Sequence, residues 1–232
     1  KPRTGAQFSA CYHTRTAPRN ARMPLDVVVV MDPIASIKPA KDSTFAMLLE
    51  AQRRGHRLHY VLPGSLSMAG ATAQAITAPL EVRDSNTDWF SLGAAAVRPF
   101  AAGDLALMRK DPPVDADYLH DTQILDLARR QGARVMNDPQ GLRDLNEKLA
   151  ALLFPQCCPP TLVSRDAAAL KAFVKAHGDA VLKPLDGMGG RSIFRAHAGE
   201  PNLNVILETL TGGGAHLAMA QRFLPEIVDG DK

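Results

Sequence analysis

The order of apolar and polar residues predicts alternating strands and helices in the first part of the chain. Residues 25–31 (LDVVVVM) form a β-branched run, which is too short for a helix and typical of a strand buried in a parallel sheet. A helix capped by Asp42 or Ser43 follows and ends before Gly55, and residues 57–62 return as a strand. Two strands joined through a helix predict a parallel pair with a right-handed crossover.

The pattern is weaker between residues 63 and 98, where scattered alanines and some alternation at 79–82 predict only short strands. Residues 104–109 resume a clear strand, and apolar positions at helical spacing predict a helix over 118–130, ended by Gly132. A short strand over 134–137 follows. This order of elements is typical of the doubly wound α/β style, with a parallel sheet covered by helices on both faces.

A second unit is predicted to begin near Asp144 or Asn146, since Asn146 can cap a helix over 147–154. The elements that follow are strands at 161–163, 180–184, 192–195 and 217–223 and helices at 166–177 and 201–210. A glycine-rich loop, Asp186–Gly190, lies between two of these strands. It therefore resembles the tip of a β-hairpin and not the entry to a helix.

Charge and cysteine content exclude several classes of protein. The net charge is +3 at pH 7, but residues 1–22 hold five basic residues and no acidic one, which leaves 22 basic and 24 acidic residues elsewhere. That balance argues against a polyanion-binding surface. No segment has the length of a membrane span or the form of a secretory signal. Cys11, Cys157 and Cys158 have neither the spacing of a disulfide framework nor that of a metal site. Taken together, these features lead us to expect a cytoplasmic protein.

The glycine-rich loop matches neither the P-loop nor the dinucleotide-binding pattern. Its glycines can bring backbone N–H groups to an anion and let a hairpin tip open and close, although a plain turn would need similar residues. Lys183 lies in the apolar strand before the loop, where an ammonium group needs water or a negative partner. A phosphate would serve, and the alternative is a lysine on an edge strand facing solvent. For Lys148 the alternative is an exposed charge on a helix.

Several motifs together resemble a known family. VVMDPI at 29–34, KDSTFAMLLEAQRRG at 41–55, MRKDPP at 108–113, LRDLNEKL at 142–149, LKPLDGMGGRSIFR at 182–195 and AQRFLPEIVDGDK at 220–232 closely resemble the prokaryotic glutathione synthetases, which are ATP-grasp enzymes. The resemblance runs from Met23 to the end of the chain. Ordered motifs over such a length are far more specific than one glycine loop.

The resemblance implies a division of the chain and a set of site residues. Residues 23–142 would be an N-terminal substrate domain, and 143–232 the first part of an α+β ATP-grasp domain whose second subdomain is missing. Residues 1–22 lack an apolar periodic stretch, and this composition by itself predicts a disordered segment or an upstream extension. Lys183 and Gly189 are the candidate catalytic residues. The candidate substrate contacts are Ser43 and Arg109, and no metal ligand can be assigned. The candidate ATP contacts are Lys148, Lys183, Asp186, Gly187, Met188, Gly189, Gly190, Gln221, Arg222, Phe223, Leu224 and Asp231.

The resemblance also implies a reaction. Glycine would be ligated to γ-glutamylcysteine through an acyl phosphate, with ATP and Mg²⁺, or Mn²⁺, taking part. Such enzymes need groups that hold and neutralise a transferring phosphoryl group, which backbone amides and lysines can do. A homo-tetramer is expected from the resemblance alone.

Two other interpretations stay open from the sequence. Another ATP-grasp carboxylate-amine ligase would share the ATP-binding parts, although MDPI and MRKDPP favour the first interpretation. Alternatively, these 232 residues by themselves are an inactive nucleotide- or substrate-binding module, because the family continues for about another domain length beyond Lys232.

Overall fold

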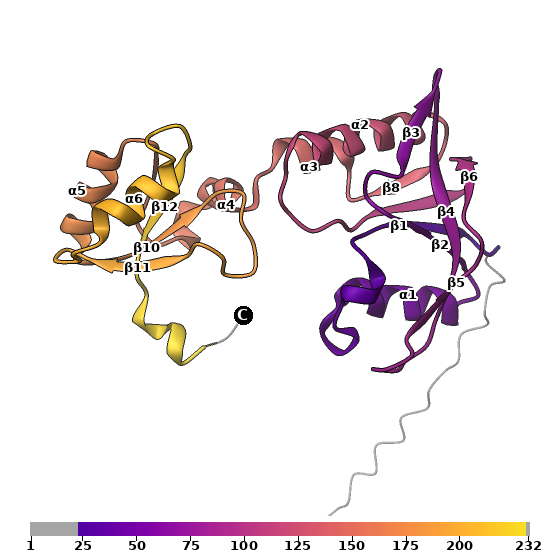
Figure 1. The fold of residues 1–232 in the computed structure, drawn as a ribbon, viewed down its shortest axis with the longest axis horizontal. Helices are drawn as coiled ribbons and strands as arrows, with labels where there is room; N and C mark the ends of the chain where they lie inside the picture. The colour runs from indigo at the N-terminus through magenta and orange to yellow at the C-terminus, as the bar shows by residue number, and fades with distance from the viewer. Residues whose placement is uncertain (1–22, 231–232) are drawn as a thin grey trace, which may run out of the picture.

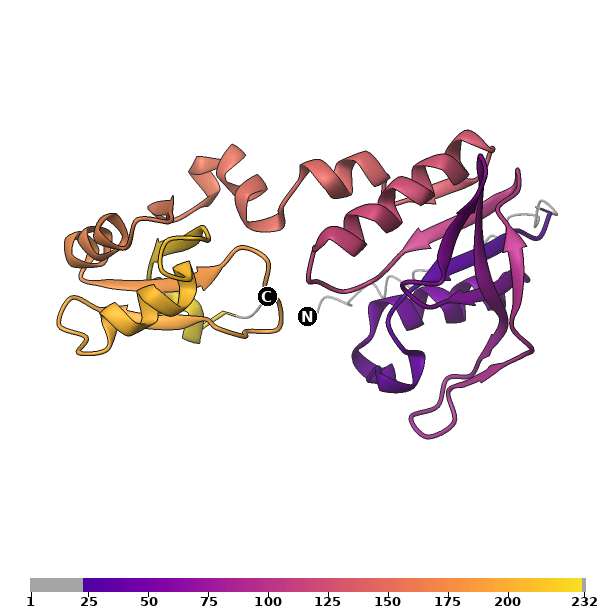
Figure 2. The same ribbon diagram turned by 45° about the horizontal axis from the view of Figure 1, so that its top comes forward.

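The computed structural model describes residues 23–230, which form two units, each built on its own sheet (Figures 1 and 2). The first unit has the strand order β3-β4-β2-β1-β7-β8. Four of these strands are parallel: β1 (Asp26–Val30), β2 (Arg57–Val61), β7 (Asp104–Met108) and β8 (Arg134–Met136). β1 lies in the middle of this parallel part and is buried, as its β-branched run predicts.

The other strands of the first unit are antiparallel and are organised around β4 (Thr72–Val82), which pairs with β2. The remaining partners of β4 are β3 (Leu66–Ala69), β5 (Phe90–Leu92) and β6 (Ala96–Pro99). The expectation of only short strands in this region was wrong, since β4 has 11 residues. Its buried positions include Ala73, Ala75 and Ala78, and such small side chains give little hydrophobic signal.

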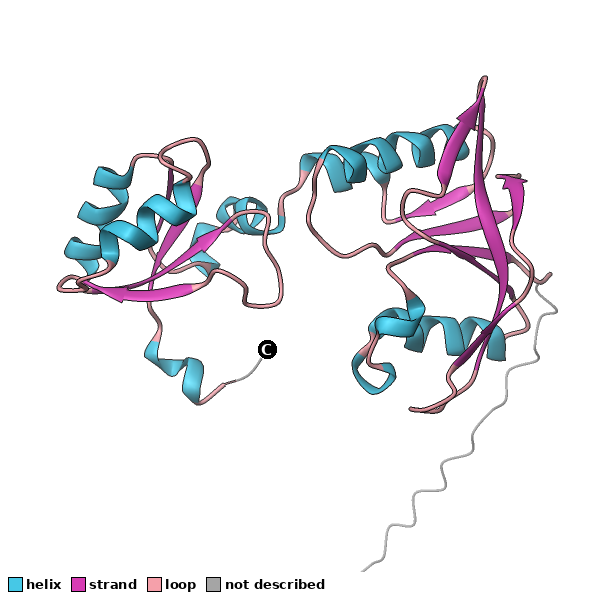
Figure 3. Ribbon diagram, in the orientation of Figure 1, coloured by secondary structure: helices cyan, strands magenta, loops and turns pink. Residues whose placement is uncertain are grey.

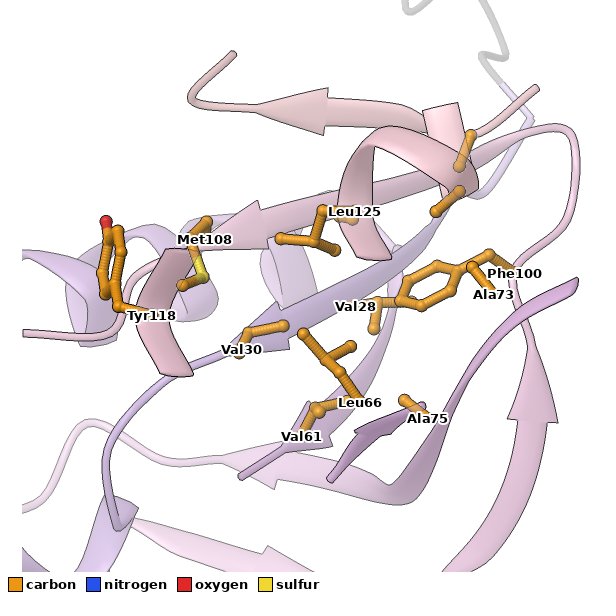
Figure 4. Close-up of a cluster of buried hydrophobic side chains, with 13 residues drawn as sticks. Val28, Val30, Val61, Leu66, Ala73, Ala75, Phe100, Met108, Tyr118 and Leu125 are labelled. Atoms are coloured by element: carbon orange, nitrogen blue, oxygen red, sulfur yellow. The ribbon is translucent and has the colours of Figure 1, made fainter. Parts of the chain in front are cut away.

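Helices cover both faces of the first sheet, as the doubly wound class requires. α1 (Ser43–Arg53) packs on one face and α2 (Ala116–Arg130) on the other, each against its own buried cluster (Figure 1). Figure 4 shows the cluster beneath α2, where Leu125 lies over Val28 and Val30 of β1. Asp42 caps α1, because its carboxylate accepts from the Phe45 amide at 2.7 Å.

A helix that the sequence analysis did not predict, α3 (Pro139–Asp144), leads out of the first unit. Pro139 occupies its first turn, and the carboxylate of Asp138 caps it by accepting from the Gln140 and Gly141 amides. Arg143 in its last turn donates to the Asp126 carboxylate and to the Thr122 hydroxyl of α2. These contacts fix α3 to the first unit.

The second unit is an antiparallel sheet in the order β11-β10-β12-β9, with two helices packed on its core (Figure 3). It begins with α4 (Glu147–Ala150) and two 3-10 turns, η3 (Ala151–Leu153) and η4 (Pro155–Cys157). Its strands are β9 (Thr161–Ser164), β10 (Asp179–Pro184), β11 (Phe194–His197) and β12 (Ala218–Arg222), and its helices α5 (Ala167–His177) and α6 (Leu203–Thr211). The 3-10 turn η5 (Pro225–Val228) ends the described chain.

Three boundaries in the second unit differ by two or more residues from those expected. The helix expected over 147–154 changes to 3-10 geometry after Ala150. β11 begins at Phe194, two residues late, because Ser192 adopts a φ of 56° that a strand does not allow. α6 begins at Leu203, so Pro201 precedes the helix. Within residues 23–230 no helix has the length and apolar character needed to cross a membrane.

Candidate nucleotide-binding site

The glycine-rich loop is the tip of an antiparallel hairpin formed by β10 and β11, which confirms that prediction. Gly189 and Gly190 have φ values of 65° and 77°, a region that glycine enters at no steric cost. A Cβ built at either residue would meet no atom within 4 Å. The tip therefore has open space on the side where a Cβ atom would project.

Lys183 lies three residues before this loop, on an inner strand of the sheet. β10 is paired with β11 on one side and with β12 on the other, where Lys183 is opposite Met219. The alternative of a lysine on an edge strand was therefore wrong. The side chain is half-buried, and within residues 23–230 its ammonium group has no hydrogen-bond or ion-pair partner. Burial lowers the pKa of Lys183, and the positive charge of nearby Lys148 lowers it further.

Lys148 approaches the same loop from α4. Its Nζ donates to the carbonyl oxygens of Gly187 at 2.7 Å and Leu185 at 3.2 Å, and to a Glu147 carboxylate oxygen at 3.0 Å. Its side chain is only 12% exposed, so the alternative of a solvated helix charge was wrong. An ammonium group has three donors, and all three are used here. Lys148 holds the start of the loop, and a contact with phosphate requires it to release one of these acceptors.

These residues surround a cavity of about 500 Å³, within the size range of small-molecule sites. Of the residues expected to bind ATP, it is lined by Lys148, Lys183, Gly187, Met188, Gly189, Gly190 and Gln221. Asp186, Arg222, Phe223 and Leu224 are not among its lining residues, and Asp231 lies outside the described residues. The sequence analysis missed Glu147, Ala151, Cys157, Cys158, Pro159, Ile193 and Met219, which also line it.

In the segment expected to meet adenine, residues 221–224, some backbone N–H groups are already hydrogen-bonded within the second unit. The Arg222 amide donates to the Pro160 carbonyl at 2.9 Å and the Phe223 amide to the Asp179 carbonyl at 3.1 Å. The Phe223 ring packs against the Arg195 guanidinium, whose central carbon is 3.7 Å from the ring centroid. The Leu224 amide has no acceptor within the described chain. Within the described chain, Leu224 is therefore the residue of this segment whose backbone N–H is unpaired.

The two candidate substrate residues lie together in the first unit. Arg109 follows β7 and Ser43 begins α1, and the guanidinium of Arg109 donates to the Ser43 hydroxyl at 3.1 Å and to the Thr44 hydroxyl at 2.9 Å. Both residues therefore lie near the carboxyl ends of parallel strands, where ligands of such sheets bind. Neither lines the cavity beside Lys183.

A smaller cavity of about 220 Å³ joins the two units. Pro112, Val114 and Tyr118 line it from the first unit, and residues 185–187 line it from the start of the glycine loop. The hairpin tip therefore lies beside the first unit as well as beside its own cavity. Within residues 23–230, no group of three or more His, Cys, Asp or Glu side chains is arranged to hold a metal ion.

Asn146 connects α4 to the hairpin and should position Lys148. Its side-chain oxygen accepts from the Lys148 and Leu149 amides, and its side-chain nitrogen donates to the Leu185 carbonyl at 3.1 Å. We expect Asn146→Ala to reduce stability by about 1 kcal/mol through the lost cap and to weaken Mg·ATP binding several-fold. Asn146→Asp keeps the cap but loses the bond to Leu185. Equal nucleotide affinity in both variants and the parent, measured by calorimetry, would contradict this role.

The pKa of Lys183 should respond to Lys148. The pKa of Lys183 in the folded chain lies below the ordinary value of 10.5, so the unfolded chain binds this proton more tightly. The contribution of Lys183 to the free energy of unfolding therefore becomes more favourable as the pH rises from the folded pKa to the unfolded pKa. Lys148→Met removes the like charge, so we expect the pKa of Lys183 to rise. Competitive acetylation across pH, read by mass spectrometry with exposed Lys175 as reference, measures this shift. An unchanged Lys183 profile would show that the two charges do not interact.

Comparison with known protein families agrees with this geometry. The model of the prokaryotic glutathione synthetase N-terminal domain matches residues 25–143, and that of the prokaryotic glutathione synthetase ATP-grasp domain matches residues 147–232. The glutathione synthetase of Xanthomonas campestris pv. campestris is 73% identical over 210 residues, which are 90% of this chain and 66% of that protein. That of Escherichia coli (strain K12) is 52% identical over 204 residues, 88% of this chain and 65% of that protein.

Solved structures with low sequence identity share the fold. A RimK domain protein ATP-grasp from Sphaerobacter thermophilus has a TM-score of 0.53 at 19% identity, covering 86% of this chain and 64% of that one. The D-cycloserine synthetase DcsG has a TM-score of 0.54 at 17% identity, covering 87% and 60%. The chain thus spans slightly less than two thirds of the length of the relatives that it matches. By its family matches and its close relatives, the chain belongs to the prokaryotic glutathione synthetase family.

Proposed function

We propose that this chain forms the substrate-binding and part of the ATP-binding machinery of a glutathione synthetase. The whole protein would join glycine to γ-glutamylcysteine and release ADP and phosphate. The observation that carries the proposal is the half-buried ammonium group of Lys183, which has no partner in the described chain and lines a cavity with the open glycine tip. An ammonium group in that position is costly unless an anion meets it.

In this proposal the residues of the cavity bind and orient the phosphates of ATP. Lys183 would neutralise charge on the transferring phosphoryl group, and the backbone N–H groups of Gly189 and Gly190 would contact its oxygens. The carboxylate of γ-glutamylcysteine would take the phosphoryl group, and the glycine amine would then displace phosphate from the acyl phosphate. We propose residues 23–142 as the substrate domain and 143–232 as the ATP-grasp part.

A divalent metal, Mg²⁺ or Mn²⁺, would accompany ATP and supply charge neutralisation between the phosphates. The described residues do not gather the side chains that such an ion needs, so we assign none of them as its ligand. Arg109, held by the Ser43 and Thr44 hydroxyls, is the proposed contact for a carboxylate of the peptide, since its guanidinium can bind a carboxylate with two parallel bonds. A cytoplasmic homo-tetramer is proposed from the family resemblance only.

The test is a ligase assay of the whole protein with γ-glutamylcysteine, glycine and Mg·ATP. We expect glutathione and ADP to form in equal amounts, and no continued ADP formation when either γ-glutamylcysteine or glycine is omitted. Turnover of ATP with a different acceptor, without glutathione, would support another carboxylate-amine ligase instead. A separate calorimetric titration of residues 1–232 with Mg·ATP tests whether this chain binds nucleotide by itself.

A further inference from the structure

Two adjacent cysteines lie in the wall of the cavity beside Lys183, and the proposed ligase reaction has no use for them. Cys157 ends the 3-10 turn η4 and is exposed, while Cys158 is partly buried. Both line the cavity together with Lys148, Lys183 and the glycine tip. Both are free thiols.

The backbone fixes the position of this pair. The Cys157 amide donates to the Phe154 carbonyl at 2.9 Å and the Cys158 amide to the Pro155 carbonyl at 3.2 Å. Pro159 and Pro160 follow directly, and their rings restrict the chain before it enters β9. The two thiols are thus held at the cavity wall and do not sit on a long loose loop.

The two thiols differ in their surroundings. The Cys158 thiol donates to the Ala151 carbonyl at 3.1 Å, which occupies its proton. Cys157 has no such partner in the described chain and is the more exposed residue. Since the thiolate is the nucleophile and access limits its reactions, Cys157 is the reactive member of the pair.

The lysines of the same cavity select the charge of an incoming molecule. Within the described chain Lys183 has an ammonium group without an anionic partner, and the second positive charge, on Lys148, is close enough to lower the pKa of Lys183. Glu147, also in the cavity wall, pairs with Lys148 at 3.0 Å, so these three side chains together carry a net positive charge. A disulfide that carries carboxylates is therefore attracted to this cavity, and one that carries amines is repelled. The distinction is independent of the reactivity of the thiol.

We propose that Cys157 is a site of reversible mixed-disulfide formation with small anionic disulfides, and that the attached group closes the nucleotide cavity. The Cys157 thiol loses its proton to water, and the thiolate attacks one sulfur of the disulfide RS–SR. The Cys157 S–SR bond forms, the original S–S bond breaks, and RS⁻ leaves and takes up a proton. Excess thiol reverses the exchange. That the cavity takes ATP rests on the proposed function.

The mixed disulfide should persist because Cys158 is badly placed to displace RS⁻. Adjacent Cα atoms are about 3.8 Å apart across a trans peptide, whereas ordinary disulfides join Cα atoms about 4.4–6.8 Å apart. The Cys157–Cys158 peptide is trans, so closing a ring between the two residues would be strained. The product is therefore a blocked cavity and not an internal disulfide.

The experiment treats the chain carrying Cys11→Ser with glutathione disulfide, which is anionic, or with cystamine, which is cationic. Peptide mass spectrometry then locates the adduct. We expect glutathione on Cys157, several-fold slower modification by cystamine, and protection by Mg·ATP. Cys158→Ser should be modified like the parent and Cys157→Ser should not. Lys183→Met should narrow the difference in modification rate between glutathione disulfide and cystamine. Dithiothreitol should remove the adduct and restore nucleotide binding.

Separate outcomes test the two proposals. Equal modification of Cys157 and Cys158, equal rates with both disulfides, or full Mg·ATP binding by the modified chain would overturn the thiol site. The opposite result is also informative. If the chain does not bind Mg·ATP before treatment but Cys157 still reacts selectively with glutathione disulfide, the nucleotide site is contradicted, and with it the closing effect of the adduct.

Discussion

Replacing Lys183 by methionine should weaken Mg·ATP binding by roughly 10- to 100-fold, the range for losing a hydrogen bond to a charged group. Methionine keeps much of the side-chain length and the apolar stem but carries no charge. Within residues 23–230 the Lys183 ammonium group has no hydrogen-bond acceptor, whereas the three donors of Lys148 are occupied by Gly187, Leu185 and Glu147. Calorimetric titration measures the loss, and in the whole protein the rate of ADP formation should fall with it.

Lys175→Met is the matched control, because Lys175 is an exposed lysine on α5 of the same unit and does not line the cavity. Its affinity should equal that of the parent. If Lys183→Met binds nucleotide as well as Lys175→Met does, Lys183 is a structural strand lysine. Lys148→Met should have a different effect, because it also releases the carbonyl groups at the start of the glycine loop.

Replacing Arg98 by methionine should reduce the unfolding free energy of the first unit by about 3 kcal/mol, the lower end of the range for breaking a buried ion pair. Arg98 donates to both carboxylate oxygens of Asp104, at 2.9 and 2.7 Å. The Asp104 side chain is only 3% exposed, so in the variant its carboxyl group would be left buried with the Ala101 amide as its remaining donor. Urea unfolding followed by fluorescence gives the value. Trp89 is the single tryptophan of the sequence and reports on this unit alone.

The same change at an exposed pair supplies the control. Arg83 and Asp88 are 41% and 75% exposed at their side chains, and Arg83→Met should cost about 1 kcal/mol or less. Adding Asp104→Asn to Arg98→Met should recover part of the stability, because it removes the unpaired charge. Similar losses for Arg98→Met and Arg83→Met would mean that burial of Asp104 contributes nothing.

The parts of the fold that the sequence predicted are those with strong local signals. The β-branched run of β1 and the capped, amphipathic α1 and α2 appear where expected. β4 was underestimated because alanines fill three of its six buried positions. α3 was missed because Pro139 suggests a break although it occupies a first turn. These features depend on how neighbouring elements pack, which local patterns do not encode.

For the site, the sequence predicted the residues better than their partners. The family resemblance brought forward Lys183 and the glycine loop, which line one cavity. It could not indicate that Lys148 is engaged by Gly187 and Leu185, because that depends on a contact across 37 and 39 residues of chain. The position of Cys157 in the cavity wall also had no local signal, since it arises from the turn η4 that brings the pair beside β10 and β12.

The contacts at the two ends of residues 143–146 limit how the two units can move. Arg143 is fixed to α2 through Asp126 and Thr122, and Asn146 is fixed to the hairpin through the Leu185 carbonyl. Only Asp144 and Leu145 lie between these anchors, and three residue steps span at most about 11 Å. While both anchors hold, this short tether lets one unit swivel against the other but does not let the two units separate.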